Sequence, residues 1–346
     1  MKKESYLLFV FLFLAMQMRA QEFDSSYIGR MRYRNNITIS QGNEGNNLAF
    51  QSLASNDGLN FSKNNYVVSS SSSQGLSLSY KWINADLNLT NVQANERQKY
   101  NLSKISWRIG MSQRAWGVKT YYGDYRGLIH SDTVNAYAVP DIRYRRAGAR
   151  FYFVNNSRRF SLGAARFQTE QQKRTAGSLI LFVEPGWTQL SSKQLLISDS
   201  MRLFPFTQNQ SGLRKVSSYK IDCMPGYTFT ISLLGGRIFF SPLYAFGAGV
   251  NYNHYVAKGG IFNTLKYTIN SYTDINLGYN GKRFFACLNV FNVSYLNVLY
   301  PVYFQHNSSG ISLTLGYRFG DLEDKLANDP LVVWKNLQQK FYPGDE

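Results

Sequence analysis

From Gly310 to Phe319 the chain reads Gly-Ile-Ser-Leu-Thr-Leu-Gly-Tyr-Arg-Phe. The apolar side chains of this stretch fall on odd-numbered positions, and Ser312, Thr314 and Arg318 fall between them. A period of two is the mark of a β-strand with one apolar face and one polar face. The stretch ends in aromatic residues, and aromatic girdles flank the apolar band of transmembrane barrels. We therefore predict that it closes a barrel by pairing with the first strand.

The same alternation recurs along the rest of the chain. Between positions 85 and 90, for example, Ala85, Leu87 and Leu89 alternate with polar residues. Polar stretches rich in Asn, Ser and Gly, such as 42–65, are predicted to be loops. The strands predicted from this pattern are residues 31–41, 67–80, 85–90, 105–111, 116–128, 142–154, 159–170, 177–190, 219–234, 237–254, 265–280, 283–297 and 310–319.

The composition also favours a barrel. Only 17% of the 346 residues are charged, 16% are aromatic, and the mean hydropathy is −0.30. A helical membrane protein would be more apolar, and a water-soluble domain usually carries more charge. Few charges and many aromatic residues, without a long apolar run, are typical of a transmembrane β-barrel. A large secreted β-sandwich is the alternative that shares this composition.

The N-terminus has the pattern of a signal peptide. Two lysines form a positive end, an apolar run covers residues 6–16, and Ala20 offers a cleavage site. The run is too short to span a bilayer as a helix, and no later apolar segment is long enough to do so. We therefore expect residues 1–20 to be a signal peptide and residues 21–319 to form a barrel in the cell outer membrane.

The short connections determine the predicted topology, because outer-membrane barrels have short periplasmic turns and long outer loops. Strand directions must alternate, so an upward strand is required between 177–190 and 219–234. Lys193–Phe204 is the candidate, and counting it gives about 14 strands. The alternative is 12 strands, if the N-terminal pair is not in the wall. The predicted fold is therefore all-β, a single antiparallel transmembrane β-barrel.

The last residues break the β pattern. Asp329 followed by Pro330 is a helix start signal. Apolar residues from Leu331 to Phe341 then recur at helical spacing. We expect residues 320–346 to be a periplasmic tail with a short amphipathic helix, which lies either in the periplasm or in the mouth of the lumen.

The chain carries a formal net charge of +17. In a cytosolic protein this charge would suggest nucleic acid. Export argues against that partner, and outer-membrane lipid, either phospholipid or lipopolysaccharide, is expected instead. The barrel-assembly machinery is a further expected partner, and no cofactor is expected. Basic residues at the short turns are predicted to contact lipid headgroups, although solvated turn charges would give the same pattern: Arg114, Arg158, Arg159, Arg237, Lys282 and Arg283.

Two stretches are specific enough to compare with known families: Asn156–Ser161, which reads Asn-Ser-Arg-Arg-Phe-Ser, and Gln171–Ser178, which reads Gln-Gln-Lys-Arg-Thr-Ala-Gly-Ser. Shorter stretches accompany them at Asp24–Ile28, Tyr80–Trp82, Tyr121–Tyr125, Pro140–Arg143, Gly226–Thr228 and Tyr317–Phe319. In this order and spacing they resemble domain-of-unknown-function family 4421, a family of Gram-negative outer-membrane barrels. The chain departs from the family pattern at 91–102 and in its longer tail. The resemblance implies a barrel and transfers no activity and no site residues.

The sequence contains three histidines, His130, His254 and His306, which the predicted topology places at the outer rim. Some outer-membrane lipid enzymes use a Ser–His–acid set near that surface, and His130 is followed by Ser131 and Asp132. Neighbours in sequence are weak evidence for a triad that forms in space. We therefore assign no catalytic residue, and no ligand spacing supports a metal site.

The two cysteines, Cys223 and Cys287, lie far apart in the sequence. We do not expect their strands to be adjacent. Two free thiols are therefore predicted, with a disulfide as the alternative.

Strand parity assigns a set of charged residues to the lumen: Asp86, Arg108, Lys119, Arg146, Arg150, Lys220, Asp222, Lys266 and Asp274. Facing rings of Arg and Asp would set the ion selectivity of a pore, whereas paired charges would fill a closed barrel. The leading hypothesis is a non-enzymatic outer-membrane barrel that acts as a passive pore or an envelope scaffold. The alternatives are a lipid-active acylhydrolase or acyltransferase at the outer rim, and a binding protein whose outer loops hold an extracellular ligand.

Overall fold

The computed structural model describes residues 23–33, 35–52, 63–80, 83–91, 103–131, 136–193, 213–257, 260–298 and 302–320. The predicted signal peptide and the predicted tail helix lie outside these residues, as does nearly all of the predicted strand Lys193–Phe204. No helix in the described part of the chain is long and apolar enough to cross a bilayer.

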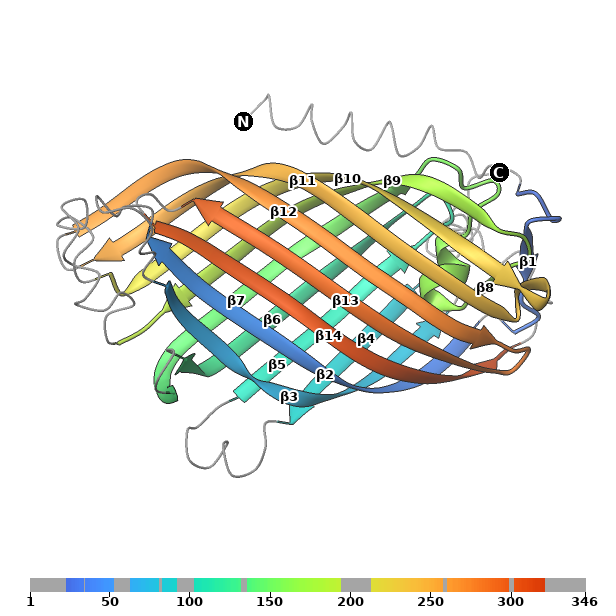
Figure 1. Ribbon diagram of the computed structural model, residues 1–346, viewed down its shortest axis with the longest axis horizontal. Coiled ribbons are helices and arrows are strands. Elements are labelled where there is room, and N and C mark those ends of the chain that lie inside the picture. Colours follow the sequence, from blue (N-terminus) through green and yellow to red (C-terminus); the bar gives the residue numbers. More distant parts are fainter. Residues whose placement is uncertain are drawn as a thin grey trace, which may run out of the picture.

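Twelve strands form a closed antiparallel barrel (Figure 1). In chain order these are β2 (Asn35–Ser52), β3 (Lys63–Tyr80), β4 (Ile83–Asn91), β5 (Ser103–Ser112), β6 (Trp116–Ser131), β7 (Ala136–Val154), β9 (Ala176–Ser191), β10 (Lys215–Leu233), β11 (Ile238–Ala257), β12 (Gly260–Asn280), β13 (Phe284–Val298) and β14 (Val302–Phe319). Strand β14 pairs with β2, and Phe319 lies opposite Asn35. The prediction that Gly310–Phe319 closes the barrel against the first strand is therefore confirmed.

The strands are tilted relative to the barrel axis. A row of directly paired residues therefore shifts along the axis as it passes from strand to strand around the wall. A path along directly paired residues that starts at Tyr279 on β12 returns to β12 at Leu265. A tilt of about 40° between strands and axis produces such a shift. Every residue on this path is aromatic or aliphatic: Tyr279, Ala286, Leu315, Ile39, Leu76, Leu87, Trp107, Tyr122, Ala147, Trp187, Tyr219, Tyr252 and Leu265.

The apolar residues of the strands point outward. On β14, Leu313 is 52% exposed and Leu315 is 50% exposed, whereas Arg318 is completely buried. A water-soluble protein of this size would bury most of its large apolar side chains. An apolar outer face and a polar inner face suit a wall surrounded by lipid. The alternative of a secreted β-sandwich is therefore wrong, because the sheet closes on itself.

We call the end of the barrel with the short connections the turn end and the other the loop end. The short 3-10 helix η4 (Leu234–Gly236) lies in one connection at the turn end. Near the loop end, β3 pairs directly with β6, because β4 and β5 have only 9 and 10 residues and stop below. The backbone of Tyr66 lies opposite that of His130 there.

Residues 155–175 form a segment that enters the turn end of the barrel, and we call this segment the plug. It contains the π-helix η1 (Gly163–Phe167) and strand β8 (Glu170–Gln172), and β8 pairs with β1 (Ile28–Arg30) in a two-stranded sheet outside the wall (Figure 1). Three buried plug residues, Phe160, Leu162 and Ala165, belong to one apolar cluster with inward-facing wall residues. The wall members of this cluster are Tyr152, Val154, Ile180, Phe182, Met224, Leu243, Ala245 and Tyr272.

The plug corrects the predicted strand count. Residues Arg159–Glu170 were expected to be a wall strand, but all of them belong to the plug, and Glu170 is the first residue of the short strand β8. Counting them as a wall strand reversed the predicted direction of 177–190 and created the need for an upward strand at Lys193–Phe204. Without it, β9 and β10 are consecutive antiparallel neighbours, and the barrel closes with 12 strands instead of 14.

The N-terminal pair was also misjudged. The predicted loop 42–65 is largely strand, because β2 continues to Ser52 and β3 begins at Lys63. Both strands belong to the wall. The alternative count of 12 strands is therefore right, but its reason, that the N-terminal pair lies outside the wall, is wrong. The polar composition that suggested a loop reflects polar residues on the outer face of β2, which are considered below.

Lipid-facing positions should tolerate charge poorly. We expect Leu313→Arg to lower the free energy of unfolding in lipid vesicles by about 2–4 kcal/mol, because the guanidinium would face hydrocarbon. Leu234→Arg, in the exposed turn after β10, is the matched control and should change stability by less than about 0.5 kcal/mol. Equal losses in the two variants, measured by denaturant titration, would contradict the placement of Leu313 in lipid.

Candidate functional site: a polar network across the lumen

The nine residues predicted to face the lumen occupy strand positions that alternate with the lipid-facing ones. Eight of them belong to side-chain groups described below. The ninth, Lys266 on β12, lies opposite Asn251 on β11, whose side chain is completely buried. Strand parity alone therefore predicts which residues face inward. Which of them contact one another depends on how the wall closes.

Glu184 on β9 is the centre of the network. Its carboxylate is completely buried and accepts hydrogen bonds from the Tyr121 and Tyr295 hydroxyls at 2.8 and 3.0 Å. Arg150 donates from Nε to the other carboxylate oxygen at 2.6 Å, and the Lys220 ammonium lies 3.7 Å away. Two cations and two phenols thus surround one carboxylate, which is the arrangement that a buried charge requires.

The contacts of this network cross the lumen. Tyr295 is on β13, which is four strands from β9 in the order of the wall. Tyr144 on β7 and His306 on β14 are six strands apart in a wall of 12, and so come from opposite sides. The Tyr144 hydroxyl nevertheless lies 3.3 Å from His306 Nδ1, and the His306 ring stacks on Tyr295 with 5.9 Å between centroids. Side chains from opposite walls therefore meet inside the barrel.

Lys220 joins Glu184 to a second carboxylate. Its Nζ donates to Asp222 Oδ2 at 2.6 Å, and Thr268 donates to Asp222 Oδ1 at 2.7 Å. Lys220 also lies over the Tyr295 ring, 3.7 Å from its centroid. The two carboxylates consequently share one lysine and extend the network from β9 to β12.

Another charged group lies on the strands β4 to β7. Asp86 accepts from Lys119 at 2.6 Å, and Arg108 lies 3.9 Å from the same carboxylate oxygen. Arg146 lies over the Tyr121 ring, 5.8 Å from its centroid. Asp86 is thus paired with two cations, whereas Arg146 is held over an aromatic ring.

The plug contributes a cation of its own. Arg166 in η1 donates to the carboxylate of Asp274 and to the hydroxyl of Tyr272, both on β12. Burial opposes the charge on Arg166, but the Asp274 carboxylate and Tyr272 outweigh that effect, and the pKa of the guanidinium lies above its usual value. The plug is therefore tied to the wall by an ion pair that stays charged.

The closing seam holds the end of the plug helix. Arg318 donates from Nε and Nη2 to the Gln168 carbonyl at 3.0 and 2.7 Å, and from Nη1 to the Gly281 carbonyl. Gln168 has a φ of 50°, in the left-handed region, and ends η1. Asn36, which lies opposite Arg318 across the seam, donates to the Phe167 carbonyl at 3.4 Å. The two strands of the seam thus contact adjacent plug residues, Gln168 from β14 and Phe167 from β2.

The predicted headgroup cations differ in their surroundings. Arg158, Arg237 and Lys282 are exposed at the turn end. Arg114 instead donates to Glu170 of the plug at 2.6 Å and is only partly exposed. An arginine bound to a carboxylate is less available to lipid, so Arg114 has a structural contact that sequence did not indicate.

The other two predicted cations also have partners. Arg159 lies 3.9 Å from Asp24 Oδ2, and Ser26 donates its hydroxyl and its backbone N–H to the other oxygen of that carboxylate. These hydrogen bonds lower the pKa of Asp24. Arg283 donates to the Tyr33 and Tyr317 hydroxyls at 2.9 and 3.0 Å, and these contacts raise its pKa. Both arginines therefore have polar partners at the turn end.

The two histidines whose side chains the structure describes do not lie at one site. His254 is on the outward face of β11, where its Nδ1 lies 2.7 Å from Asn263 Oδ1. His306 was expected at the outer rim but is buried in the lumen between aromatic rings, because its position on β14 has the inward parity. Two histidines on opposite faces of the wall cannot serve one triad. Among the described residues, no group of three His, Cys, Asp or Glu side chains could hold a metal ion.

Both cysteines are free thiols. Cys223 faces outward on β10, and Cys287 is buried on the inner face of β13. The prediction of two free thiols is confirmed, because the two residues lie on opposite faces of strands that are not neighbours.

Several residues of the network were missed by sequence reasoning: Glu184, Tyr121, Tyr295, Arg166 and Arg318. Glu184 could have been found, because it shares the parity of Phe182 on β9. Tyr121 and Tyr295 also have inward parity, but a tyrosine suits either face of a wall strand. Arg166 had no usable signal, since its segment was taken for a wall strand.

A family model described as a domain of unknown function, DUF4421, matches residues 22–319. The chain belongs to this family. The resemblance inferred from the short stretches is thereby confirmed. No curated protein matches the chain.

Solved outer-membrane proteins share a distant likeness with the chain. The outer-membrane protease OmpT of Escherichia coli is 9% identical, with 82% of this chain and 96% of that chain covered and a TM-score of 0.37. The beta domain of the Bordetella autotransporter BrkA is 10% identical, with 81% and 100% covered and a TM-score of 0.34. Ail of Yersinia pestis is 10% identical, with 83% and 99% covered and a TM-score of 0.18. At these TM-scores the likeness carries no argument about function.

Removing the central carboxylate should destabilise the barrel. We expect Glu184→Gln to lower the free energy of unfolding in vesicles by about 3–5 kcal/mol, because Arg150 and Lys220 would remain buried without their counter-charge. Tyr295→Phe, which removes one hydrogen bond to the same carboxylate, should lower it by about 1.5–3 kcal/mol. A Glu184→Gln variant as stable as the parent would show that the network does not support the fold.

Loss of the seam contact should loosen the plug without opening the wall. In Arg318→Met, backbone amides of residues 160–172 should exchange with deuterium about tenfold faster or more, since the carbonyls of Gln168 and Gly281 lose a charged donor. Amides of β14 and β2 should keep their protection. Arg283→Met, at the exposed turn nearby, is the control and should leave the exchange of the plug unchanged.

Proposed function

We propose that this protein is a closed outer-membrane barrel that acts as an envelope scaffold and not as a passive pore. The observation that supports this most directly is the contact between Tyr144 and His306, which come from opposite sides of the wall. A passive pore requires a continuous water path through the lumen. Side chains that touch across the full width of the barrel interrupt such a path.

The interruption is repeated along the axis of the barrel. The Glu184 network joins β9 to β13, and the Arg166–Asp274 pair joins the plug to β12. The apolar cluster around Phe160 and Leu162 then fills the turn end. Three different kinds of contact therefore support a filled lumen, and the loss of any single one would leave the others in place.

The proposed location follows from the outer surface. A closed sheet pairs its backbone N–H and C=O groups between strands, and an apolar outer face is compatible with lipid. A barrel in an outer membrane requires both. Lipid headgroups, phospholipid or lipopolysaccharide, would meet the exposed cations of the turn end, such as Arg158 and Arg237. The two-stranded β1–β8 sheet at the same end would present a surface for attachment in the periplasm.

The chemistry of the described residues does not favour an enzyme. His306 lies between Tyr144 and Tyr295 inside the barrel, where an outer-leaflet lipid cannot reach it. His254 lies on the outer face next to Asn263. The third alternative, a binding protein that uses its outer loops, concerns segments outside the described residues.

Conductance in planar bilayers tests the proposal. The purified parent protein should produce no channel events. A variant in which residues 160–170 are replaced by a flexible linker, combined with Tyr144→Ala and His306→Ala, should conduct, because both the plug and the cross-lumen contact are removed. Steady channel events from the parent protein would refute the closed barrel.

Cells offer a second measurement. Deletion of the gene should increase leakage of periplasmic protein, as expected when a scaffold is lost, and should leave uptake of small solutes unchanged. Reduced uptake with an intact envelope would favour a pore. Complementation with the parent gene is the control.

A further inference from the structure

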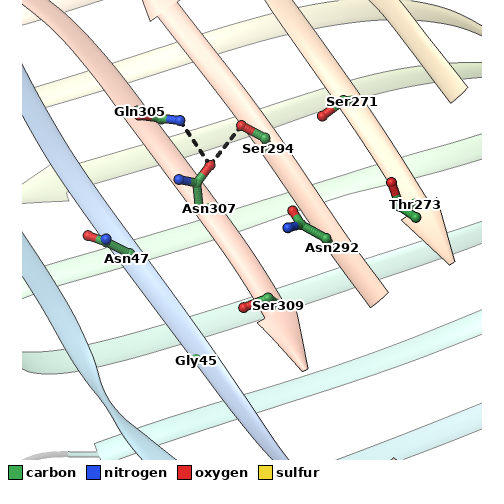
Figure 2. A pocket seen from close by; sticks show the side chains of 9 residues that line it. All are labelled: Gly45, Asn47, Ser271, Thr273, Asn292, Ser294, Gln305, Asn307 and Ser309. Atoms are coloured by element: carbon green, nitrogen blue, oxygen red, sulfur yellow. Dashed lines mark hydrogen bonds between the residues drawn. The ribbon is translucent and has the colours of Figure 1, made fainter. Parts of the chain in front are cut away.

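A neutral polar patch interrupts the apolar outer surface on one side of the barrel. It lines a hollow of about 520 Å³ over β12, β13, β14 and β2, and Figure 2 labels its residues. The patch occupies positions that alternate with the lumen-facing ones, so its side chains point away from the lumen. We call the set of labelled residues the polar wall patch. Six of its members are Asn47, Ser271, Asn292, Ser294, Asn307 and Ser309.

The patch is continuous across four strands. Ser271 lies opposite Ser294, Ser294 opposite Asn307, and Asn307 opposite Asn47. In the neighbouring row Asn292 lies opposite Ser309. Cross-strand pairs are the units from which a sheet surface is built, so these residues form one surface.

On β12 the patch lies inside the apolar belt and not above it. On β12, Leu277 on the turn side of the patch is 47% exposed, and Ile269 on the loop side is 48% exposed. On β14, Ile311 and Leu313 face outward directly below Ser309. Polar side chains are thus framed by apolar ones on both sides along β12, and on the turn side along β14.

Lipid cannot satisfy these side chains. Ser294 and Gln305 donate to Asn307 Oδ1 at 2.7 and 3.2 Å, which satisfies part of the patch internally. Asn47 Oδ1 is buried and has no hydrogen-bond partner among the described residues. Hydrocarbon tails offer neither donors nor acceptors, and the polar groups of phospholipids stay at the membrane surface. The occupant of the patch must therefore carry polar groups at the same depth.

We propose that the polar wall patch is the interface with a second copy of this chain. A two-fold axis along the membrane normal places every residue opposite residues of the same depth, so each copy offers its patch to the patch of the other. Amide and hydroxyl side chains can each donate and accept, and such a surface is complementary to itself. No charged side chain lines the patch, so two strongly basic copies do not repel each other there.

The size of the side chains supports the same partner. Gly45 and the serines on β12, β13 and β14 leave the hollow, which admits side chains from a facing wall. Small and polar residues are those that bring transmembrane segments into close contact in lipid. The proposal does not depend on whether the lumen conducts, and pairing of copies would serve a scaffold and a pore equally.

Cysteine crosslinking in intact membranes tests the interface. Cys223→Ser and Cys287→Ser remove the native thiols, and Ser294→Cys or Asn307→Cys then places a single thiol in the patch. Oxidation or a short bifunctional maleimide should shift the protein to twice the monomer mass. The matched control keeps Cys223 as the only thiol, which is exposed on the outer face of β10 outside the patch, and should remain monomeric.

A second measurement uses the protein without introduced cysteines. In mild detergent the parent should have the mass of a dimer by light scattering, and Asn292→Leu with Ser294→Leu should be monomeric and still fold, as judged by heat-dependent migration. The proposal is overturned if folded patch-cysteine variants remain monomeric, or if the Cys223 control dimerises equally. It is also overturned by crosslinking to a protein of another mass, or by patch-dependent retention of lipid on a monomer.

Discussion

The structure depends on the seam between β14 and β2. In lipid every backbone N–H and C=O must be bonded within the protein, and a sheet meets this constraint only when it closes. The seam completes the wall over the whole length of β14, from Val302 to Phe319. It also holds the plug, because Arg318 and Asn36, opposite each other across the seam, both donate to the end of η1. Closing the wall therefore also brings together two of the side chains that hold the plug.

The lumen follows from the problem of burying charge. Apart from the apolar cluster around the plug, the inner face of the barrel carries many charged side chains, and unpaired charges inside it would be costly. The chain pairs them: Glu184 with Arg150 and Lys220, and Asp274 with Arg166 of the plug. Such pairs need good geometry from several strands at once, and removing one member leaves the rest uncompensated. This makes a filled lumen the natural state of this wall.

Polar side chains on the outer face also need partners when they lie in the membrane. Alternation sends every second residue toward lipid, and most of these are aromatic or aliphatic. Where they are polar, on β12, β13, β14 and β2, the wall needs a polar neighbour in the membrane. The two faces therefore affect different properties of the protein. The inner face determines whether solute can pass through the lumen, and the outer face determines which molecule contacts the barrel in the membrane.

By itself, the sequence determined the class of fold, the closing strand and the parity of each wall strand. These are local properties, because a strand with one apolar face repeats every two residues wherever it lies. Parity alone assigned Asp86, Lys220 and Asp274 to the inner face, and would have assigned Glu184 as well. Local pattern misled at Arg159–Glu170, since Phe160, Leu162 and Ala164 alternate as a wall strand does, but all three are buried and the first two pack inside the barrel. Only the tertiary structure decided which side chains meet across the lumen, as Tyr144 meets His306. Such contacts depend on the number of strands and on their shear, and both are set only when the whole sheet closes.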